Sequence, residues 1–228
     1  MVIDGISITG SYHQSNQDSF LCSALDGGFV IAISDGLGSL CDSKTGSQAL
    51  CNCVVEHAKE LKHKLLSISP QEFVTQVHKL WLQSLEAKDP SQCYATMLFV
   101  IAYQERVFAG QLGDGFIGLW LDDVFMLIRD DKDINFINET DCLTENLDMS
   151  LFVFVDTKIS TIHGVVLSTD GFELDDMSFE SLKEFTKEFI VGYRQLNQVS
   201  VAKHVLSWLE QWPGCDDKTI AYAINSED

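Results

Sequence analysis

The chain has 228 residues, of which 46% are hydrophobic and 21% are charged. It is long enough to bury a core as one domain, and its 3 prolines argue against a long disordered linker. Lys and Arg total 15 against 34 acidic residues, which gives a net charge of −19. Such a surface repels nucleic-acid backbones and anionic lipids, so we expect neither as a partner. No apolar run reaches the ~20 residues that span a bilayer.

The seven cysteines form an odd, scattered set without a C-x-x-C pair. The first ten residues contain neither a basic segment nor an apolar one, so we expect a cytoplasmic protein with free thiols. Cys51, Cys53 and His57 suggest zinc, but their spacing spreads them around a helix and no fourth ligand is evident. We interpret the two cysteines as buried thiols.

In the first part of the chain, strands precede a pair of helices. Residues 2–9 alternate loosely, as in a strand, and the apolar run Phe29–Ser34 predicts a buried strand that ends in a turn at Asp35-Gly36. Ser43 is the expected N-cap of a helix that extends to about Leu66. Ser69-Pro70 is typical of a second helix start, and this helix should extend to about Ala87.

From Tyr94 onward the pattern changes to β-branched and aromatic runs, which predict an antiparallel meander of strands at 95–103, 107–112, 116–121 and 124–128. A polar, acidic stretch follows, and we expect a variable segment over 129–150. Further strands are predicted at 151–156, 165–168 and 218–224, with helices near 178–191 and 200–212. Helices and strands are grouped and do not alternate one by one, which favours an α+β layered sandwich over a doubly wound parallel sheet.

Aspartates recur at the predicted strand ends. Asp18 precedes an apolar strand, Asp35 and Asp170 each follow one, Asp114 lies between two, and Asp216-Asp217 precedes the last. Glycine follows Asp35, Asp114 and Asp170, so the backbone can turn sharply there and a ligand can approach closely. A single Asp-Gly pair is ordinary turn chemistry, whereas the recurrence at strand ends suggests a common site.

Carboxylates gathered at one rim repel each other: two unit charges 4 Å apart cost about 4 kcal/mol at an effective dielectric near 20. Bound cations would cancel this repulsion. Hard oxygen ligands point to Mg²⁺ or Mn²⁺ rather than zinc. Two such ions ~3.5–4 Å apart activate a water for attack on a phosphate ester, without a protein nucleophile.

Two other ligand motifs fail on inspection. The acidic stretch 130–139 resembles a calcium loop, but its sixth position is Phe136 instead of Gly and its twelfth is Cys142 instead of Glu. Residues 36–45 contain phosphate-loop residue types in the wrong order. We therefore interpret the first as a solvated loop and give nucleotide binding little weight.

Five segments in order resemble the metal-dependent protein phosphatases of type 2C. They are GSYHQSNQDS (10–19), AISDGLGS with a following TGS (32–39, 45–47), ATMLFVIA with FAGQLGDG (95–102, 108–115), VVLSTDGF (165–172) and GCDDKTIAYA (214–223). Each motif is weak alone, but together they span nearly the whole chain. The resemblance implies a four-layer α-β-β-α sandwich, with two antiparallel sheets packed face to face and helices on both outer sides, as one domain over 1–228.

The resemblance also implies metal ligands. Asp35 corresponds to the carboxylate that bridges two Mn²⁺ or Mg²⁺ ions, and the Gly36 carbonyl is a further ligand. Asp170 and Asp216 correspond to the other ligands of one ion. Asp114 corresponds to a residue that joins Asp170 at a weaker third site in many bacterial members.

Asp18 is similar to the family acid that holds metal-bound waters. His13 occupies the position of the phosphate-binding Arg, Gln17 that of a usual Glu, and Leu37 that of a histidine proposed as general acid in some members. His13 and the segment INETDCLT (137–144) together make the chain similar to a bacterial branch of the family. That branch has an N-E-T segment in place of the usual flap. A protonated His13 could donate to a phosphate oxygen.

Two functional hypotheses follow from these residues. The first is a phosphatase for phosphoserine and phosphothreonine in proteins, acting as a monomer opposite a serine/threonine kinase. The second, motivated by the missing Arg and by Gln17, is a catalytically silent module that binds a phosphoprotein or a kinase. Retention of Asp35, Asp170 and Asp216 favours the first, because clustered like charges without cations destabilise a fold.

Overall fold

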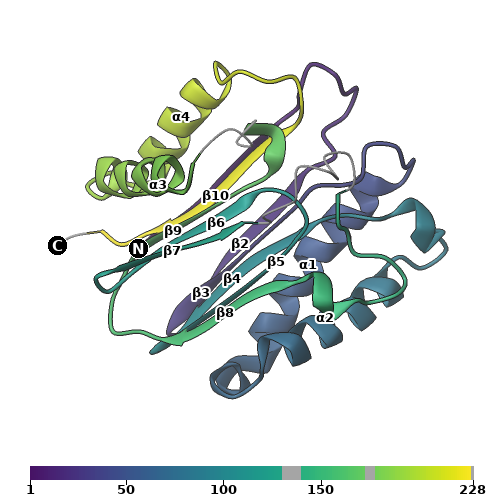
Figure 1. The fold of residues 1–228 in the computed structure, drawn as a ribbon, viewed down its shortest axis with the longest axis horizontal. Helices are drawn as coiled ribbons and strands as arrows, with labels where there is room; N and C mark the ends of the chain where they lie inside the picture. Colours follow the sequence, from purple (N-terminus) through teal and green to yellow (C-terminus); the bar gives the residue numbers. More distant parts are fainter. Residues whose placement is uncertain (130–139, 173–177, 227–228) are drawn as a thin grey trace.

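The computed structural model describes residues 1–129, 140–172 and 178–226. Within this part, ten strands form two antiparallel sheets of five (Figure 1). In order across the first sheet they are β1 (Val2–Ile8), β10 (Lys218–Ile224), β9 (Ile162–Ser168), β6 (Phe116–Leu121) and β7 (Val124–Arg129). Across the second they are β2 (Ser19–Leu25), β3 (Gly28–Ser34), β4 (Met97–Tyr103), β5 (Arg106–Leu112) and β8 (Val153–Lys158).

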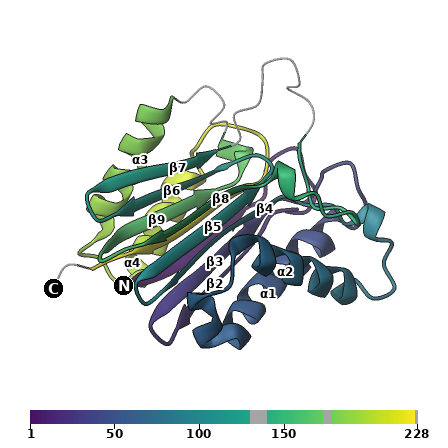
Figure 2. The same cartoon turned by 60° about the horizontal axis from the view of Figure 1, so that its bottom comes forward.

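Helices cover the outer face of each sheet (Figures 1 and 2). Against the β2–β8 sheet lie α1 (Ser43–Leu61) and α2 (Pro70–Ser84), and against the β1–β7 sheet lie α3 (Phe179–Tyr193) and α4 (Gln198–Leu209). Short 3₁₀ turns are η1 (Lys62–Leu66), η2 (Pro90–Gln92), η4 (Met149–Leu151) and η5 (Asp170–Phe172). The predicted α+β four-layer sandwich is confirmed.

Three apolar layers hold these elements together. Between the sheets, β-branched residues such as Ile31 and Val100 interdigitate. Trp81 of α2 lies in the layer under α1 and α2, and Phe189 of α3 lies in the layer under α3 and α4. The alternating side chains of a strand face opposite ways, so β3 and β4 contribute to layers on both faces and are buried along almost their whole length. This rigid frame fixes where the strand ends lie.

Two details of the predicted helices differ from the structure. Asp42, not Ser43, precedes the first turn of α1, and its side chain makes no capping bond. This helix ends at Leu61 because Lys62 adopts φ 48°, after which η1 continues to Leu66. The start of α2 is as expected, since Ser69 accepts a hydrogen bond of 3.1 Å from the Glu72 backbone N–H.

The predicted meander over 95–128 is wrong, because β5 and β6 lie in different sheets. The chain changes sheet at Gly113-Asp114-Gly115, where both glycines have positive φ, 87° and 105°. Glycine adopts a positive φ without strain, whereas residues with a side chain are strained there. The strand pattern on either side is the same in a meander and in a sheet change, so it does not distinguish them.

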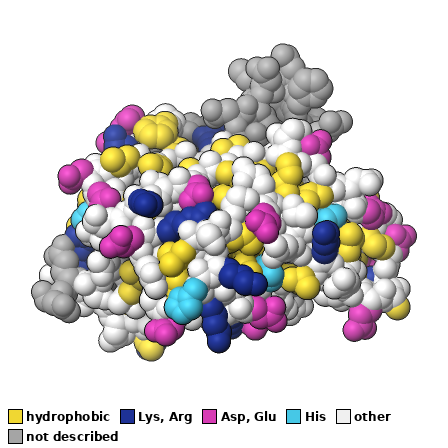
Figure 3. Space-filling model, turned by 90° about the horizontal axis from the view of Figure 1, so that it is seen from below, with side chains coloured by type: hydrophobic (Ala, Val, Ile, Leu, Met, Phe, Trp, Pro, Cys, Tyr) yellow, Lys and Arg dark blue, Asp and Glu magenta, His cyan; other side chains and the backbone are white. Residues whose placement is uncertain are grey.

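The face of the molecule seen from below carries mixed charges despite the acidic excess of the sequence (Figure 3). Seen from below, basic side chains are interspersed with acidic and apolar ones (Figure 3). Within the described residues, no helix combines the length and apolar character needed to cross a bilayer. The calcium-loop candidate at 130–139 lies outside the described residues, and so do residues 137–139 of the segment INETDCLT.

Candidate metal centre

Strand register brings the predicted aspartates to one edge of the sandwich. In the β2–β8 sheet, Ser19 pairs with Ser34, so Asp18 and Asp35 leave neighbouring strands at the same level. In the β1–β7 sheet, Ser168 pairs with both Phe116 and Ile220. Asp114, Asp170 and Asp216 therefore flank three adjacent strands at one edge. Asp18 and Asp216 are 198 positions apart in the chain, yet they lie at the same edge because β2 and β10 both begin there.

A threonine pair connects the two sheets at this edge. Thr169 donates a hydrogen bond from its hydroxyl to Asp18 Oδ2, at 2.8 Å, and receives one from the Thr219 backbone N–H at 3.1 Å. Asp18 is only 2% exposed. A buried carboxylate needs specific hydrogen-bond donors. The bond between Thr169 and Asp18 therefore connects the end of β9 to the start of β2.

Asp18 and Asp35 form the electrostatic centre of the group. Burial raises the pKa of Asp18 to about 6. Burial also raises the pKa of Asp35 well above its ordinary range, and the charges of Asp18, Asp170 and Asp216 act in the same direction. A hydrogen bond joins the two carboxyls, lowering the pKa of Asp18 and raising that of Asp35. Burial is the largest cause of both shifts, so the two carboxyls share one buried environment in which negative charge is disfavoured.

The backbone around Asp35 is fixed from both sides. Its N–H donates to Thr96 Oγ1 at 2.9 Å, and its carbonyl accepts from the Thr96 N–H at 2.8 Å. At Gly36 an added Cβ would lie 2.6 Å from the Ser43 carbonyl oxygen, so only glycine fits. The Asp35-Gly36 turn therefore packs between the start of α1 and the strand that follows Tyr94.

His13 contacts the acidic pair at the start of β10. Its Nδ1 lies 2.9 Å from Asp217 Oδ2 and 3.5 Å from Asp216 Oδ1. Its pKa is raised, mainly by the hydrogen bond to Asp217, while partial burial opposes the rise. One ligand atom from each of these three residues lies within 4.8 Å of the other two. Among the described residues this is the group of three potential ligands that meets this distance, and it does not include Asp35 or Asp170. Asp216 belongs both to this group and to the surroundings of Asp35.

Asp217 is the residue of this edge to which the sequence assigned no role. Its Oδ1 accepts from the Gly10 N–H at 2.8 Å, and its Oδ2 accepts from the Gln17 N–H at 2.6 Å as well as facing His13. It is 2% exposed. In the sequence, only its position next to Asp216 distinguished Asp217. Its hydrogen-bonding partners lie about two hundred positions away in the chain. Asp217 holds the 10–17 loop against residues 214–217.

Asp114 lies at the turn between β5 and β6 and accepts a hydrogen bond of 2.6 Å from the Thr140 hydroxyl. Gly115 beside it packs so closely that an added Cβ would be 2.3 Å from the Ser168 carbonyl oxygen, two residues before Asp170. The structure thus places Asp114 on the same edge as Asp170. Asp114 is not among the charges that act most strongly on the pKa of Asp35.

The segment that begins at Thr140 lies beside the Asp35-Gly36 turn. Ala95 forms β-bridges with both Gly36 and Leu143, and the Leu37 N–H donates to the Tyr94 carbonyl at 3.0 Å. The Tyr94 hydroxyl donates a short hydrogen bond to Glu145. Sequence reasoning gave Tyr94 no role beyond a strand start, yet it joins the variable segment to the candidate site.

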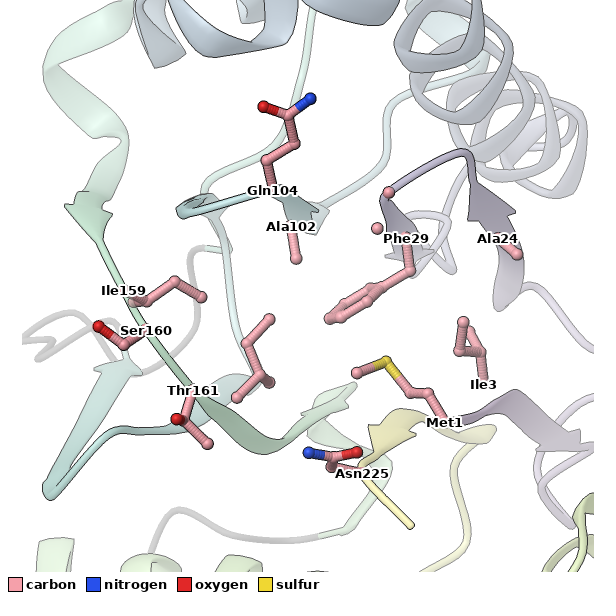
Figure 4. A pocket seen from close by; sticks show the side chains of 13 residues that line it. Met1, Ile3, Ala24, Phe29, Ala102, Gln104, Ile159, Ser160, Thr161 and Asn225 are labelled. Atoms are coloured by element: carbon pink, nitrogen blue, oxygen red, sulfur yellow. The ribbon is translucent and has the colours of Figure 1, made fainter. Parts of the chain in front are cut away.

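The donor set fits divalent cations. Carboxylates converge from both sheets, and the pKa of Asp35 is raised first by burial and then by the charges of Asp18, Asp170 and Asp216. Oxygen donors of this kind match Mg²⁺ and Mn²⁺, whose binding would offset the repulsion. A cavity of about 620 Å³ is lined by residues that include Met1, Phe29 and Ile159 (Figure 4). Phe29 and Ala102 in its lining lie at the ends of β3 and β4 remote from Asp35, so this cavity is separate from the edge that carries Asp18, Asp35, Asp114, Asp170 and Asp216 (the aspartate edge).

Fold and site together define a two-sheet sandwich with a carboxylate-lined edge, and comparison with known proteins identifies its class. The model of the protein phosphatase 2C family matches residues 10–210. The chain belongs to this family. No curated protein matches the sequence.

Solved structures share the fold at low identity. The serine/threonine phosphatase PstP/Ppp of Mycobacterium tuberculosis has 16% identity and a TM-score of 0.67, with 98% of this chain and 100% of that chain covered. A bacterial serine phosphatase has 11% identity and a TM-score of 0.67, with 99% and 98% covered. The catalytic domain of PstP in complex with two manganese ions has 15% identity and a TM-score of 0.65, with 97% and 98% covered.

Proposed function

We propose that this protein hydrolyses phosphoserine and phosphothreonine in other proteins, with two Mn²⁺ or Mg²⁺ ions held at the aspartate edge. The observation that carries the proposal is that strand register brings Asp18, Asp35, Asp170 and Asp216 to one edge of the sandwich. Family membership and the manganese bound to PstP support it. A serine/threonine kinase would supply the phosphoproteins, and we propose that the enzyme acts in the cytoplasm as a monomer.

In this proposal, Asp35, the Gly36 carbonyl, Asp170 and Asp216 would hold the ions. Asp114 and Asp170 would hold a weaker third ion. The ions, when bound, would activate a water and offset negative charge on the phosphate. Because metal ligands must be deprotonated and burial raises the pKa of Asp35, metal binding would be coupled to the loss of protons from this buried group.

The roles of Asp18 and His13 follow from their surroundings. Asp18, held by the Thr169 hydroxyl, would orient water molecules and accept their protons. His13 would contact the phosphate. Its raised pKa increases the cationic fraction near neutral pH, and the Asp217 bond at Nδ1 leaves Nε2 for a phosphate oxygen. In this way His13 would supply part of the charge stabilisation that an arginine supplies in relatives.

The test is metal-dependent turnover of p-nitrophenyl phosphate and of a phosphothreonine peptide. We expect activity with Mn²⁺ that EDTA abolishes, a loss of at least 1,000-fold in Asp35→Asn, and a drop in kcat of about 100-fold in His13→Ala. The exposed Asp26→Asn is the matched control and should be as active as the wild type. A rate independent of metal and of Asp35 would refute the proposal. Metal binding with saturable phosphopeptide binding but no turnover would favour the silent binding module instead.

A further inference from the structure

Tyr12 stands out among the large side chains near the candidate metal centre because it is 81% exposed. Its neighbour His13 is one of the residues that face Asp216 and Asp217. Within the described residues, no hydrogen bond, ion pair or ring contact engages the Tyr12 side chain. An aromatic ring left in water forgoes the burial that normally stabilises it, so the fold gains little from this tyrosine.

The backbone that carries Tyr12 is fixed. Its N–H donates to the Cys215 carbonyl at 3.0 Å, and the His13 N–H donates to the Gly10 carbonyl at 3.2 Å. At Gly10 the two loops are so close that an added Cβ would lie 2.1 Å from the carbonyl carbon of Asp216. Asp217 adds bonds to the loop at Gly10, His13 and Gln17. The ring is therefore exposed on an anchored loop, and its position is defined relative to Asp216.

We propose that Tyr12 is a specificity-determining residue that stacks on the side chain next to the phosphoresidue of a peptide substrate. The inference rests on the proposed phosphatase function. Adjacent Cα atoms are about 3.8 Å apart and an extended peptide advances about 3.3–3.6 Å per residue. Tyr12 is the chain neighbour of His13, so a phosphate held at His13 would bring the adjacent substrate residue next to the loop position that carries Tyr12.

The preferred neighbour is arginine. Its planar guanidinium stacks on aromatic faces and is held by the ring electrons. The protein carries a net charge of −19, so its overall field favours a cationic side chain over an anionic one. A glycine at the same place offers neither contact. The substrate class is thus a phosphopeptide with arginine beside the phosphoserine or phosphothreonine.

The experiment compares two phosphothreonine peptides that differ only in arginine or glycine on both sides of the phosphoresidue, with p-nitrophenyl phosphate as a substrate that lacks neighbours. For the wild type we expect kcat/KM about tenfold higher on the arginine peptide, through KM. Tyr12→Ala should reduce this ratio to about twofold, and Tyr12→Phe should retain it. All three proteins should hydrolyse p-nitrophenyl phosphate within twofold of each other. Val199→Ala, which truncates another exposed apolar side chain, on α4, is the control.

Two results would overturn the inference. One is an unchanged arginine preference in Tyr12→Ala. The other is an equal loss on p-nitrophenyl phosphate, which would mean that the substitution disturbs the loop and not peptide recognition. If the wild type hydrolyses none of the three substrates in Mn²⁺, the proposed function itself fails, and this outcome is distinct from both.

Discussion

His13 Nδ1 and Asp217 Oδ2 lie 2.9 Å apart although 204 positions separate the two residues in the chain. This contact joins the loop before β2 to the loop before β10, and so links the two sheets at the candidate metal centre. The same carboxylate accepts the Gly10 and Gln17 N–H groups. Asp217 therefore holds the 10–17 loop in place at this edge and also contacts His13.

Replacing Asp217 by alanine should destabilise the protein by about 3 kcal/mol, because buried N–H groups lose their acceptor at about 1–3 kcal/mol each. Urea unfolding in EDTA measures the change in the free energy of unfolding. Asp26→Ala, which truncates an exposed aspartate, should leave it unchanged. Equal stability of the Asp217 variant and the wild type would show that the loop does not depend on this carboxylate.

Gly10→Ala should distort the contact between the loops at 10–17 and 214–217, because the added Cβ would lie 2.1 Å from the Asp216 backbone. We expect a loss of stability of about 2 kcal/mol and weaker Mn²⁺ binding, since overpacking typically costs about 1–3 kcal/mol. Gly192→Ala in α3 is the matched control. Nothing lies within 4 Å of its added Cβ, so it should be stabilising by about 0.5–1 kcal/mol. A neutral Gly10→Ala would mean that the two loops are not in tight contact.

The sequence predicted the local part of this edge and not the long-range part. An apolar run followed by Asp-Gly predicts a strand end with an aspartate, and β3 with Asp35 and β9 with Asp170 follow this rule. The pairing of Asp217 with the first motif depends on register across two sheets, which no local pattern encodes. The change of sheet at Gly113–Gly115 was missed for the same reason. The early end of α1 at Lys62 required a backbone conformation that residue type does not predict.

The stability of the metal-free protein should fall as pH rises from about 4 to 6. Burial raises the pKa of Asp18 to about 6 in the folded state, against about 3.9 unfolded. Between these values the folded state keeps a proton that the unfolded state releases, so raising the pH favours unfolding, by about 3 kcal/mol across the window. Urea unfolding at several pH values in EDTA, compared with Asp18→Asn, isolates this contribution. Identical pH profiles for the two proteins would contradict the assignment.

Binding of Mn²⁺ should release protons from the Asp18–Asp35 pair, because burial raises the pKa of both carboxyls and metal ligands must be deprotonated. The apparent affinity should therefore rise with pH, by up to tenfold per unit. Isothermal titration calorimetry in buffers of different ionisation enthalpy counts the released protons. Asp35→Asn should remove both the proton release and most of the affinity. Binding without proton release would mean that the metal avoids this carboxyl.

The most direct test is the anomalous difference map of a crystal soaked in Mn²⁺. The account predicts paired peaks at the aspartate edge, with Asp35 between them and with Asp170 and Asp216 beside one of them. A single peak confined to His13 and Asp217, or no peak near Asp35 at saturating Mn²⁺, would contradict it.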